Sequence, residues 1–413
     1  MSSARKTLGA VFSVVLLDLL GFGIIVPVIA PLFVSDGATF GLSLSLNTRE
    51  IMLGCMIAVY PLMQFFSAPF LGAIADRHGR RKLLMVCLAA TVVDYILCAI
   101  AIVTNQFWLL LVSRGIAGFL GGNIAIARAV IADVSTEKTK AKNFGIIGIA
   151  VGVGFIIGPF LGSIFSDASL VSWFTFATPF WLSAILAAGS LVVVWLHLPE
   201  TLRTPVKQKV TLLTGPRHIA HAFRLPMLRS LFSTAFLQLF GFAIYTQFFQ
   251  VFFIQRFNPT QLAIGLAIGY IGLLVVIAQG VLNPLCVRFV GERRLVMWSL
   301  AALAVSIAGV AISYSQPLLF TYLGISALAS GFIYPNITAL VSNSAAATNQ
   351  GEIMGLYQSI ESLAQAIGPF VAGFVAAYGE GMPLFLAAAS VALAWYVCSF
   401  LFTEKQTEIF LEA

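Results

Sequence analysis

Charged residues are scarce in this chain. Lysine, arginine, aspartate and glutamate make up 9% of its 413 residues, and 60% of the residues are hydrophobic. A soluble domain carries about a quarter charged residues, so this chain cannot hide its apolar surface in a water-soluble core. The composition excludes a large soluble protein and indicates a polytopic membrane protein.

Motifs of metalloproteins and ATP-driven proteins are also missing. The chain has no G-x-x-x-x-G-K-[ST] loop, so nothing indicates that ATP drives it. We expect no enzyme activity, no metal and no other cofactor, and the net charge of +7 gives no case for a nucleic-acid partner. The cysteines lack metal-ligand spacing, and we interpret them as buried, inert thiols. They are Cys55, Cys87, Cys98, Cys286 and Cys398.

Long apolar stretches recur along the whole chain. A bilayer-spanning helix needs roughly 20 residues, and backbone groups in lipid must be satisfied within the span, so these stretches predict transmembrane helices. The first stretch lacks a convincing signal-peptide cleavage site and continues past Pro27, so we count it as a helix. We predict twelve spans near 8–34, 50–74, 82–103, 107–132, 143–165, 172–197, 226–255, 261–285, 295–314, 316–344, 352–378 and 381–403.

Lysine and arginine predict the orientation. With the N-terminus inside, almost all loop cations fall on the cytoplasmic side, and the outer side receives Arg49 and Arg256. We therefore expect both termini to be cytoplasmic and the protein to lie in a bacterial inner membrane. The inner cations are Arg5, Lys6, Arg77, Arg80, Arg81, Lys82, Lys138, Lys140, Lys142, six basic residues between Arg203 and Arg229, Arg288, Arg293 and Arg294.

One tetrapeptide, Ile-Gly-Pro-Phe, occurs at 157–160 and again at 367–370. Other short strings match at nearly the same offset of about 210 residues, including "GFLGGNIA" with "GFIYPNIT". The chain is thus predicted to contain two six-helix bundles, residues 1–197 and 226–413, joined by a basic cytoplasmic linker, 198–225. Duplicated halves are a common transporter architecture, with the substrate site at their interface.

The first copy of the string lies in a glycine strip. Its glycines recur at steps that place a flat strip on one face of the fifth span, where another helix can approach closely. Ordinary tight packing is the alternative interpretation. The residues of the strip are Gly145, Gly154, Gly158, Pro159 and Gly162.

Four motifs resemble those of the major facilitator superfamily, in particular its twelve-helix drug:proton antiporters. They are "LLDLLGFGIIVPVIAPL", "GAIADRHGRRK", "SRGIAGFLGG" and the glycine strip, in which Ser163 replaces the final glycine of the antiporter signature. "YPLMQFFSAPFLGAIADRHGRR" and "VVDYILCAI" are similar to tetracycline efflux carriers. The resemblance implies an all-α membrane protein of two pseudo-symmetric six-helix bundles that couples proton movement to alternating access.

Ionisable residues at membrane depth are costly and suggest function. Four are expected there: Asp18, Asp94, Arg114 and Glu361. Loss of water favours the neutral form of a carboxyl group, so each acid is a candidate to load and release a proton. The alternative for each is a static interhelical ion pair, and Asp94 could merely pair with Arg114.

Glu361 belongs to a polar stripe with Gln358 and Gln365, at i, i+3 and i+7, which we expect to line the cavity. Mostly apolar walls with a few amides suit an amphipathic drug-like molecule. Further candidates for the substrate wall are Gln238, Tyr245, Gln247, Gln250, Asn123 and Asn336, the last two equivalent in the repeat.

The loop between the second and third spans is the second candidate site. Positive-inside charge explains part of it, but not the acid, Asp76, before the basic run. By resemblance, Asp76 helps to hold the two bundles together on the cytoplasmic side, acting on the positive end of the eleventh span and on Arg128. Val287 stands where the second bundle would need the acid, so we expect a one-sided latch. The motif residues are Gly72, Asp76, Arg77, Gly79, Arg80 and Arg81.

The sequence therefore predicts a proton-coupled antiporter that exports small amphipathic molecules, with protons, a small-molecule substrate and the lipid bilayer as partners, and we expect a monomer. An importer or metabolite exchanger on the same fold is the alternative, and a transport-dead sensor is a third possibility. A sensor should lack the membrane carboxylates that this chain keeps.

Overall fold

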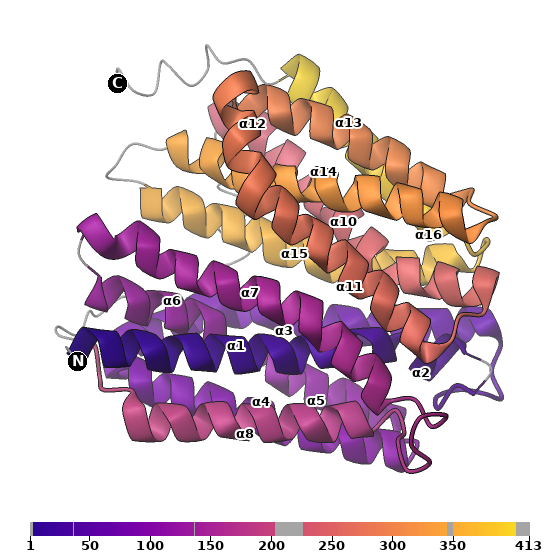
Figure 1. Ribbon diagram of the computed structural model, residues 1–413, viewed down its shortest axis with the longest axis horizontal. Coiled ribbons are helices and arrows are strands. Elements are labelled where there is room, and N and C mark those ends of the chain that lie inside the picture. The colour runs from indigo at the N-terminus through magenta and orange to yellow at the C-terminus, as the bar shows by residue number, and fades with distance from the viewer. Residues whose placement is uncertain (1–2, 36, 136, 203–225, 345–349, 402–413) are drawn as a thin grey trace. The chain divides into compact units, whose positions relative to one another are not determined.

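The computed structural model describes residues 3–35, 37–135, 137–202, 226–344 and 350–401. Nearly all of these residues are helical, and no strand occurs among them (Figure 1). The predicted linker lies almost entirely outside the described residues.

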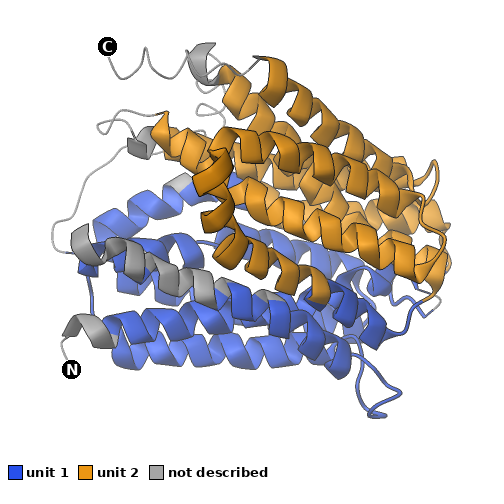
Figure 2. Ribbon diagram, turned by 45° about the horizontal axis from the view of Figure 1, so that its top comes forward, with its two compact units in different colours: residues 1–42, 63–214, 259–269 blue, residues 43–62, 215–258, 270–413 orange. Residues whose placement is uncertain are grey.

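The chain forms two compact units (Figure 2). Unit 1 takes residues 1–42, 63–214 and 259–269, and unit 2 takes residues 43–62, 215–258 and 270–413. The helices of the first half are α1 (Ser3–Ile29), α2 (Pro31–Val34), α3 (Leu46–His78), α4 (Arg80–Val103), α5 (Phe107–Phe119), α6 (Asn123–Val134), α7 (Glu137–Phe165) and α8 (Thr178–His197). Those of the second half are α10 (Pro226–Phe257), α11 (Gln261–Ile277), η1 (Ala278–Leu282), α12 (Asn283–Val290), α13 (Glu292–Ala311), α14 (Gln316–Asn343), α15 (Gln350–Ala376), α16 (Met382–Tyr396) and η2 (Val397–Leu401).

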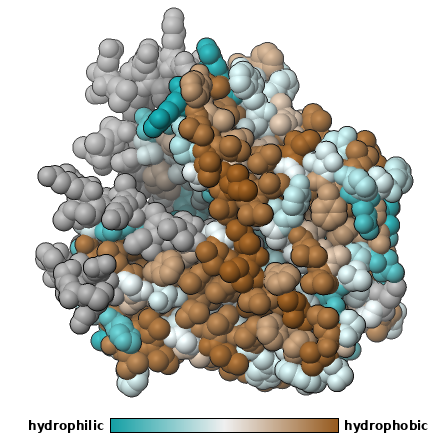
Figure 3. All heavy atoms as spheres, in the orientation of Figure 1, coloured by the Kyte–Doolittle hydropathy of each residue, from teal (hydrophilic) through white to brown (hydrophobic). Residues whose placement is uncertain are grey.

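Every predicted span coincides with a helix or with helices in series, so the twelve-helix prediction is confirmed. Eleven segments of the described chain are long and apolar enough to cross a bilayer, and the shorter apolar stretch Gly152–Phe165 lies within α7. Large apolar side chains such as Trp108 and Phe289 are 73% and 88% exposed, as lipid contact requires. Figure 3 shows apolar residues spread across one face, with hydrophilic residues mainly near its edges.

The units do not follow the predicted division of the chain at α3 and α11. The first part of α3 belongs to unit 2, and the first part of α11 belongs to unit 1. Both segments make backbone-to-backbone contacts through a glycine, Gly54 on α15 and Gly265 on α7. A division at a single point in the chain cannot predict that the start of α3 belongs to unit 2 and the start of α11 to unit 1.

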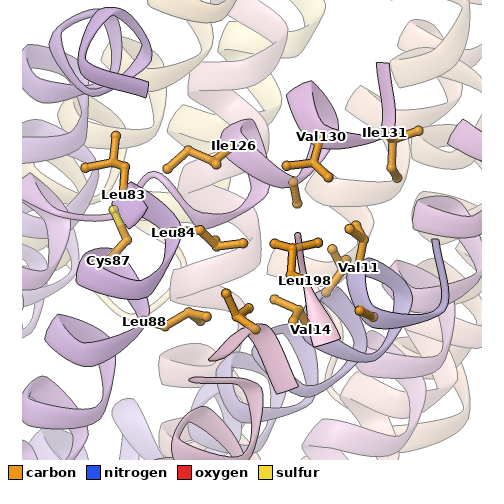
Figure 4. Packing of buried hydrophobic residues seen from close by; sticks show 14 of the residues in the cluster. Val11, Val14, Leu83, Leu84, Cys87, Leu88, Ile126, Val130, Ile131 and Leu198 are labelled. Carbon is orange, nitrogen blue, oxygen red and sulfur yellow. The ribbon is translucent and has the colours of Figure 1, made fainter. Parts of the chain in front are cut away.

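Unit 1 has a core where α1, α4 and α6 meet (Figure 4). Each helix contributes buried side chains at three- and four-residue steps, which place them on one face. They include Val11, Val14, Leu84, Leu88, Ile126 and Val130, with Leu198 beyond the end of α8. This core positions the parts of α1, α4 and α6 that carry polar groups in the middle of the membrane span.

Two glycines make the sharp turns between consecutive helices. Gly79 joins α3 to α4 with φ of 105°, and Gly291 joins α12 to α13 with φ of 81°. Positive φ suits glycine because it lacks Cβ. The backbone turn is therefore repeated in the two halves even though the charges around it differ.

Candidate transport site

The fourth span is not one helix. α5 ends at Phe119 and α6 begins at Asn123, with Gly121 and Gly122 between them. The amide of Gln64 in α3 donates to the Gly121 carbonyl at 2.7 Å, so a side chain satisfies a backbone group that the break releases. The two glycines were the signal for this break, but the apolar run across them hid it.

Asn123, the first residue of α6, contacts Asp18 of α1. Its Nδ2 donates to Asp18 Oδ1 at 3.0 Å and lies 3.2 Å from Thr91 Oγ1 of α4. Asn123 is buried and Asp18 is half-buried. Within the described part of the chain, Asn123 Oδ1 has no hydrogen-bond partner. The sequence proposed Asp18 and Asn123 for separate roles, and the structure brings them together.

Asp94 and Arg114 form a buried ion pair between α4 and α5. Arg114 Nε donates to Asp94 Oδ1 at 3.2 Å, and Arg114 Nη2 contacts Asp94 Oδ2. Cys98 donates its thiol to Asp94 at 3.4 Å and lies 3.2 Å from Ser113 Oγ. The guanidinium lies over the Tyr95 ring, 5.5 Å from its centroid. The structure therefore shows the pair of Asp94 with Arg114 that the sequence left open as an alternative.

Glu361 lies on α15 between the two glutamines of its stripe. Gln358 Nε2 donates to one carboxylate oxygen at 3.2 Å, and Gln365 Nε2 donates to the other at 3.3 Å. Both glutamines are exposed and Glu361 is half-buried. The three side chains therefore share one face, as their spacing predicts, and the amides hold the carboxylate from both sides.

The predicted substrate wall divides into buried and accessible residues. Gln238, Tyr245 and Gln250 of α10 are 2–3% exposed, whereas Gln247 is half-buried. Tyr245 shares a 2.5 Å hydrogen bond with Ser326 of α14. Tyr245 thus links α10 to α14 within unit 2.

Asn336 of α14 is likewise engaged inside unit 2. Its Nδ2 donates to Asn283 Oδ1 and to the Phe332 carbonyl, both at 2.6 Å. Asn283 follows η1, a short π-helix. Asn123 and Asn336 thus occupy equivalent positions, but one meets a carboxylate and the other an amide.

The charged loop after α3 is organised around Arg80. Its guanidinium contacts Asp133 at 2.6 Å and Asp76 at 3.2 Å. The predicted partner of Asp76, Arg128, lies exposed on α6, and the described residues show no ion pair between the two. Arg80, the first residue of α4 after the Gly79 turn, contacts Asp76 instead.

Glu200, just beyond α8, was missed by the sequence analysis. Its carboxylate accepts hydrogen bonds from the backbone amides of Arg80 at 2.9 Å and Arg81 at 3.2 Å. These amides begin α4, so Glu200 caps that helix across 120 residues of sequence. Arg81 also donates to the Trp195 carbonyl at 2.6 Å. The remaining motif residues, Gly72 and Arg77, are exposed.

The glycine strip of α7 packs directly on α1. A Cβ built on Gly158 would lie 2.7 Å from the Cα of Gly23, and one built on Gly154 would lie 2.8 Å from the Cβ of Leu19. A Cβ on Gly162 would meet the Ile24 carbonyl. Gly145 belongs to α7, but its surroundings lie outside the described residues. Only glycine allows this approach, so the strip is a packing seam.

Glu50 is a further acid in a candidate membrane span, near the start of α3, in addition to Asp18, Asp94 and Glu361. It was not among the predicted site residues, because the second span was predicted to begin at residue 50 and only the neighbouring Arg49 was assigned, as an outer cation. Glu50 is 2% exposed, and Gln255 of α10 donates to its Oε1 at 2.7 Å.

In the described ranges no group of three His, Cys, Asp or Glu side chains could hold a metal ion.

The comparisons with known proteins agree with this architecture. The model of the Major Facilitator Superfamily matches residues 11–290 and 231–411. The tetracycline resistance protein, class G, of Vibrio anguillarum is 30% identical over 378 residues, which cover 88% of each chain. Major facilitator superfamily domain-containing protein 10 of Bos taurus is 28% identical over 409 residues, covering 89% of this chain and 86% of the relative.

A solved structure gives the same result. The crystal structure of the human organic anion transporter MFSD10 (TETRAN) superposes with a TM-score of 0.72 at 26% identity, covering 97% of this chain and all of that chain. The resemblance to tetracycline efflux carriers is confirmed by the relatives. The chain belongs to the Major Facilitator Superfamily and is a multi-pass membrane transporter with its twelve-helix fold.

Proposed function

We propose that this transporter exports small amphipathic molecules in exchange for protons across a bacterial inner membrane, with both termini in the cytoplasm. The observation that carries the proposal is the hydrogen bond between Asp18 and Asn123 at the break of the fourth span. The similarity to a tetracycline resistance protein supports export of a drug-like substrate.

Asn123 suits both protonation states of Asp18. Its Nδ2 donates to the carboxylate, while its buried Oδ1 is free of hydrogen bonds within the described residues. When Asp18 takes up a proton, rotation of the amide by half a turn presents Oδ1 to the new O–H donor. A buried group that lacks a partner costs about 1–3 kcal/mol, so an amide that can pair with both forms of Asp18 keeps the protonated and deprotonated states closer in free energy.

Glu361 has a comparable arrangement in unit 2. Two glutamine amides donate to its carboxylate, and the residue retains partial access to solvent. We assign proton exchange to Asp18 and Glu361 together, and a fixed structural role to the Asp94–Arg114 pair. The exposed Gln358 and Gln365, with the half-buried Gln247, are the best candidates for direct contact with a substrate.

A susceptibility panel tests this function. An efflux-deficient bacterial host would express the wild-type chain or the Asp18→Asn variant at matched levels. We expect the wild type to raise the inhibitory concentration of at least one amphipathic compound and the variant to lose most of that protection. With purified protein in liposomes that enclose a pH-sensitive dye, addition of that compound outside should then drive protons out of the lumen, and the dye should report a rise in luminal pH.

Organic-anion transport is the alternative, because the superposed human protein is described as an organic anion transporter. The panel should therefore include tetracyclines, lipophilic cations and organic anions. Uptake of an organic anion without an effect on the other classes would favour the alternative. Absence of proton movement with any transported compound would contradict proton exchange.

A further inference from the structure

Glu50 lies where the start of α3 meets two other helices of unit 2. Its carboxylate accepts a hydrogen bond from Gln255 of α10. Its backbone carbonyl lies 2.9 Å from the position that a Cβ on Gly373 of α15 would take, and the Cα of Gly54 lies 3.3 Å from it. The acid is therefore part of a tight backbone-to-backbone seam.

The same seam occurs in unit 1, but without an acid. Gln261 and Gly265 of α11 lie 211 residues after Glu50 and Gly54, at the same spacing. A Cβ on Gly265 would lie 2.8 Å from the Pro159 carbonyl, and a Cβ on Gly54 would lie 2.7 Å from the Pro369 carbonyl. Gln261 donates to the Pro27 carbonyl at 3.1 Å. The repeat thus places a titratable side chain at one seam and a neutral amide at the other.

We propose that Glu50 is a proton-binding residue that controls the packing of the start of α3 on α10 and α15. The neutral acid can remain in the seam with its hydrogen bond to Gln255. The carboxylate favours water, which the seam excludes, so loss of the proton loosens this part of α3. Protons therefore act as a ligand that keeps the seam closed.

Two cations lie near Glu50 in the chain or in the structure, Arg49 and Arg256. Arg49 precedes it and interacts with it electrostatically. Arg256, next to Gln255, pairs with Glu380 and lies 4.6 Å from the Tyr314 ring centroid. α15 contributes the uncharged Gly373. Among the described residues no ion pair forms on Glu50, so no cation compensates fully for its burial.

Glu50 is also remote from the charged loop that ends α3. Twenty-six residues separate it from Asp76 on the same helix, a distance of about 39 Å at 1.5 Å per residue. One helix thus carries an acid at each end. Asp76 sits in a partly exposed ion-pair cluster, while Glu50 sits in a closed seam.

Hydrogen–deuterium exchange of the full-length protein in lipid nanodiscs tests the proposal. Exchange would be measured between pH 5 and pH 8.5, with labelling times scaled for the intrinsic pH dependence of amide exchange. In the wild type, we expect protection of residues 46–58 to fall as pH rises, by up to about tenfold per pH unit for one proton. Residues 261–269 of α11 should show no such dependence and serve as the internal control.

Two isosteric variants distinguish the effect of the carboxyl group from the effect of the surrounding helix packing. Glu50→Gln should hold residues 46–58 at their low-pH protection over the whole range. Gln261→Glu should give residues 261–269 a pH dependence that they lack in the wild type. An unchanged pH profile in Glu50→Gln, or a flat wild-type profile, would overturn the proposal.

The wild-type and Gln261→Glu measurements decide the matter even if Glu50→Gln does not accumulate. A flat profile at residues 261–269 in Gln261→Glu would show that a carboxyl group in this seam is not enough, and would count against the proposal. No substrate is present in these measurements. Their outcome is therefore independent of whether the chain exports drugs.

Discussion

The two Ile-Gly-Pro-Phe strings lie in α7 of unit 1 and α15 of unit 2, and their surroundings differ. A Cβ on Gly158 would meet the backbone of Gly23 at 2.7 Å, whereas one on Gly368 would meet the Phe240 carbonyl at 3.0 Å and the Ala243 side chain at 3.2 Å. Ala364 and Ala372 stand where α7 has Gly154 and Gly162. At this string α7 packs backbone against backbone on α1, whereas α15 packs on α10 with alanine Cβ atoms at the neighbouring steps.

Each unit also distributes its charges differently. Unit 1 fixes Asp94 against Arg114 inside the helices, and unit 2 holds Glu361 between amides on a partly exposed face. We infer that the Asp94–Arg114 pair and the α7 strip supply rigid packing in unit 1, while Asp18 of α1 and Glu361 of α15 supply the titratable groups. Substitutions should therefore cost stability at the pair and the strip, and transport at Asp18 and Glu361.

The largest effect on stability should come from Asp94→Asn. Removing one partner of a buried ion pair costs about 3–5 kcal/mol because it leaves the other charge without compensation. Unfolding by a denaturing detergent would measure this loss. The double variant Asp94→Asn/Arg114→Gln should recover a large part of it, and a single variant as stable as the wild type would show that the pair is not structural.

Gly158→Leu should cause the second largest loss of stability. Overpacking of a close seam costs roughly 1–3 kcal/mol, and the backbone of Gly23 cannot move aside as a side chain can. Gly368→Leu is the matched variant and should cost less, since alanine side chains already line that seam. Passive proton flux in substrate-free liposomes should rise for Gly158→Leu alone. Equal leak from both variants would remove the distinction between the two seams.

Glu200→Ala should have a smaller effect. Loss of a helix cap costs about 0.5–2 kcal/mol. Glu200→Gln keeps an accepting oxygen and should retain most of the stability. Glu292→Ala at the start of α13, where no side chain of the preceding residue caps the helix, should cost only a few tenths of a kcal/mol, roughly 0.3. Thermal unfolding of the three variants gives the ranking, and equal losses at Glu200 and Glu292 would argue against the cap.

Glu361→Gln should change stability least, by no more than about 0.5 kcal/mol, because the side chain is partly exposed and keeps its shape. It should nevertheless end proton-coupled transport. Glu361→Asp keeps a titratable group and should retain part of it. Substrate-driven proton release from liposomes is the measurement, and wild-type coupling in Glu361→Gln would exclude a role for this residue in proton exchange.

Most of the fold could be predicted from the sequence because apolar length and the positions of glycine and proline act locally. The stripe of Gln358, Glu361 and Gln365 is an example, since helical spacing alone places these side chains on one face. The helix around Pro159 was predicted to continue, and it does.

Contacts between distant segments could not be predicted in the same way. Glu200 caps α4 across 120 residues, and no local pattern marks a glutamate as a cap for another helix. Glu50 is polar at the edge of an apolar run, where hydropathy cannot distinguish a solvated residue from a buried one. Arg128 was proposed for Asp76 by resemblance, as a basic residue near the fourth span, whereas in the structure Arg80 pairs with Asp76.

The break between α5 and α6 has a mechanical consequence for the fourth span. A continuous helix transmits rotation along its length. In the break, the backbone amides of Leu120, Gly121 and Gly122 donate hydrogen bonds only to carbonyls of the preceding four residues, and the helix does not continue through them. Torsion of α6 about its own axis can therefore move Asn123 without twisting the turn of α5 that holds Arg114. The break thus acts as a hinge in the fourth membrane crossing, with the ion-paired Arg114 on one side and Asn123, the partner of Asp18, on the other.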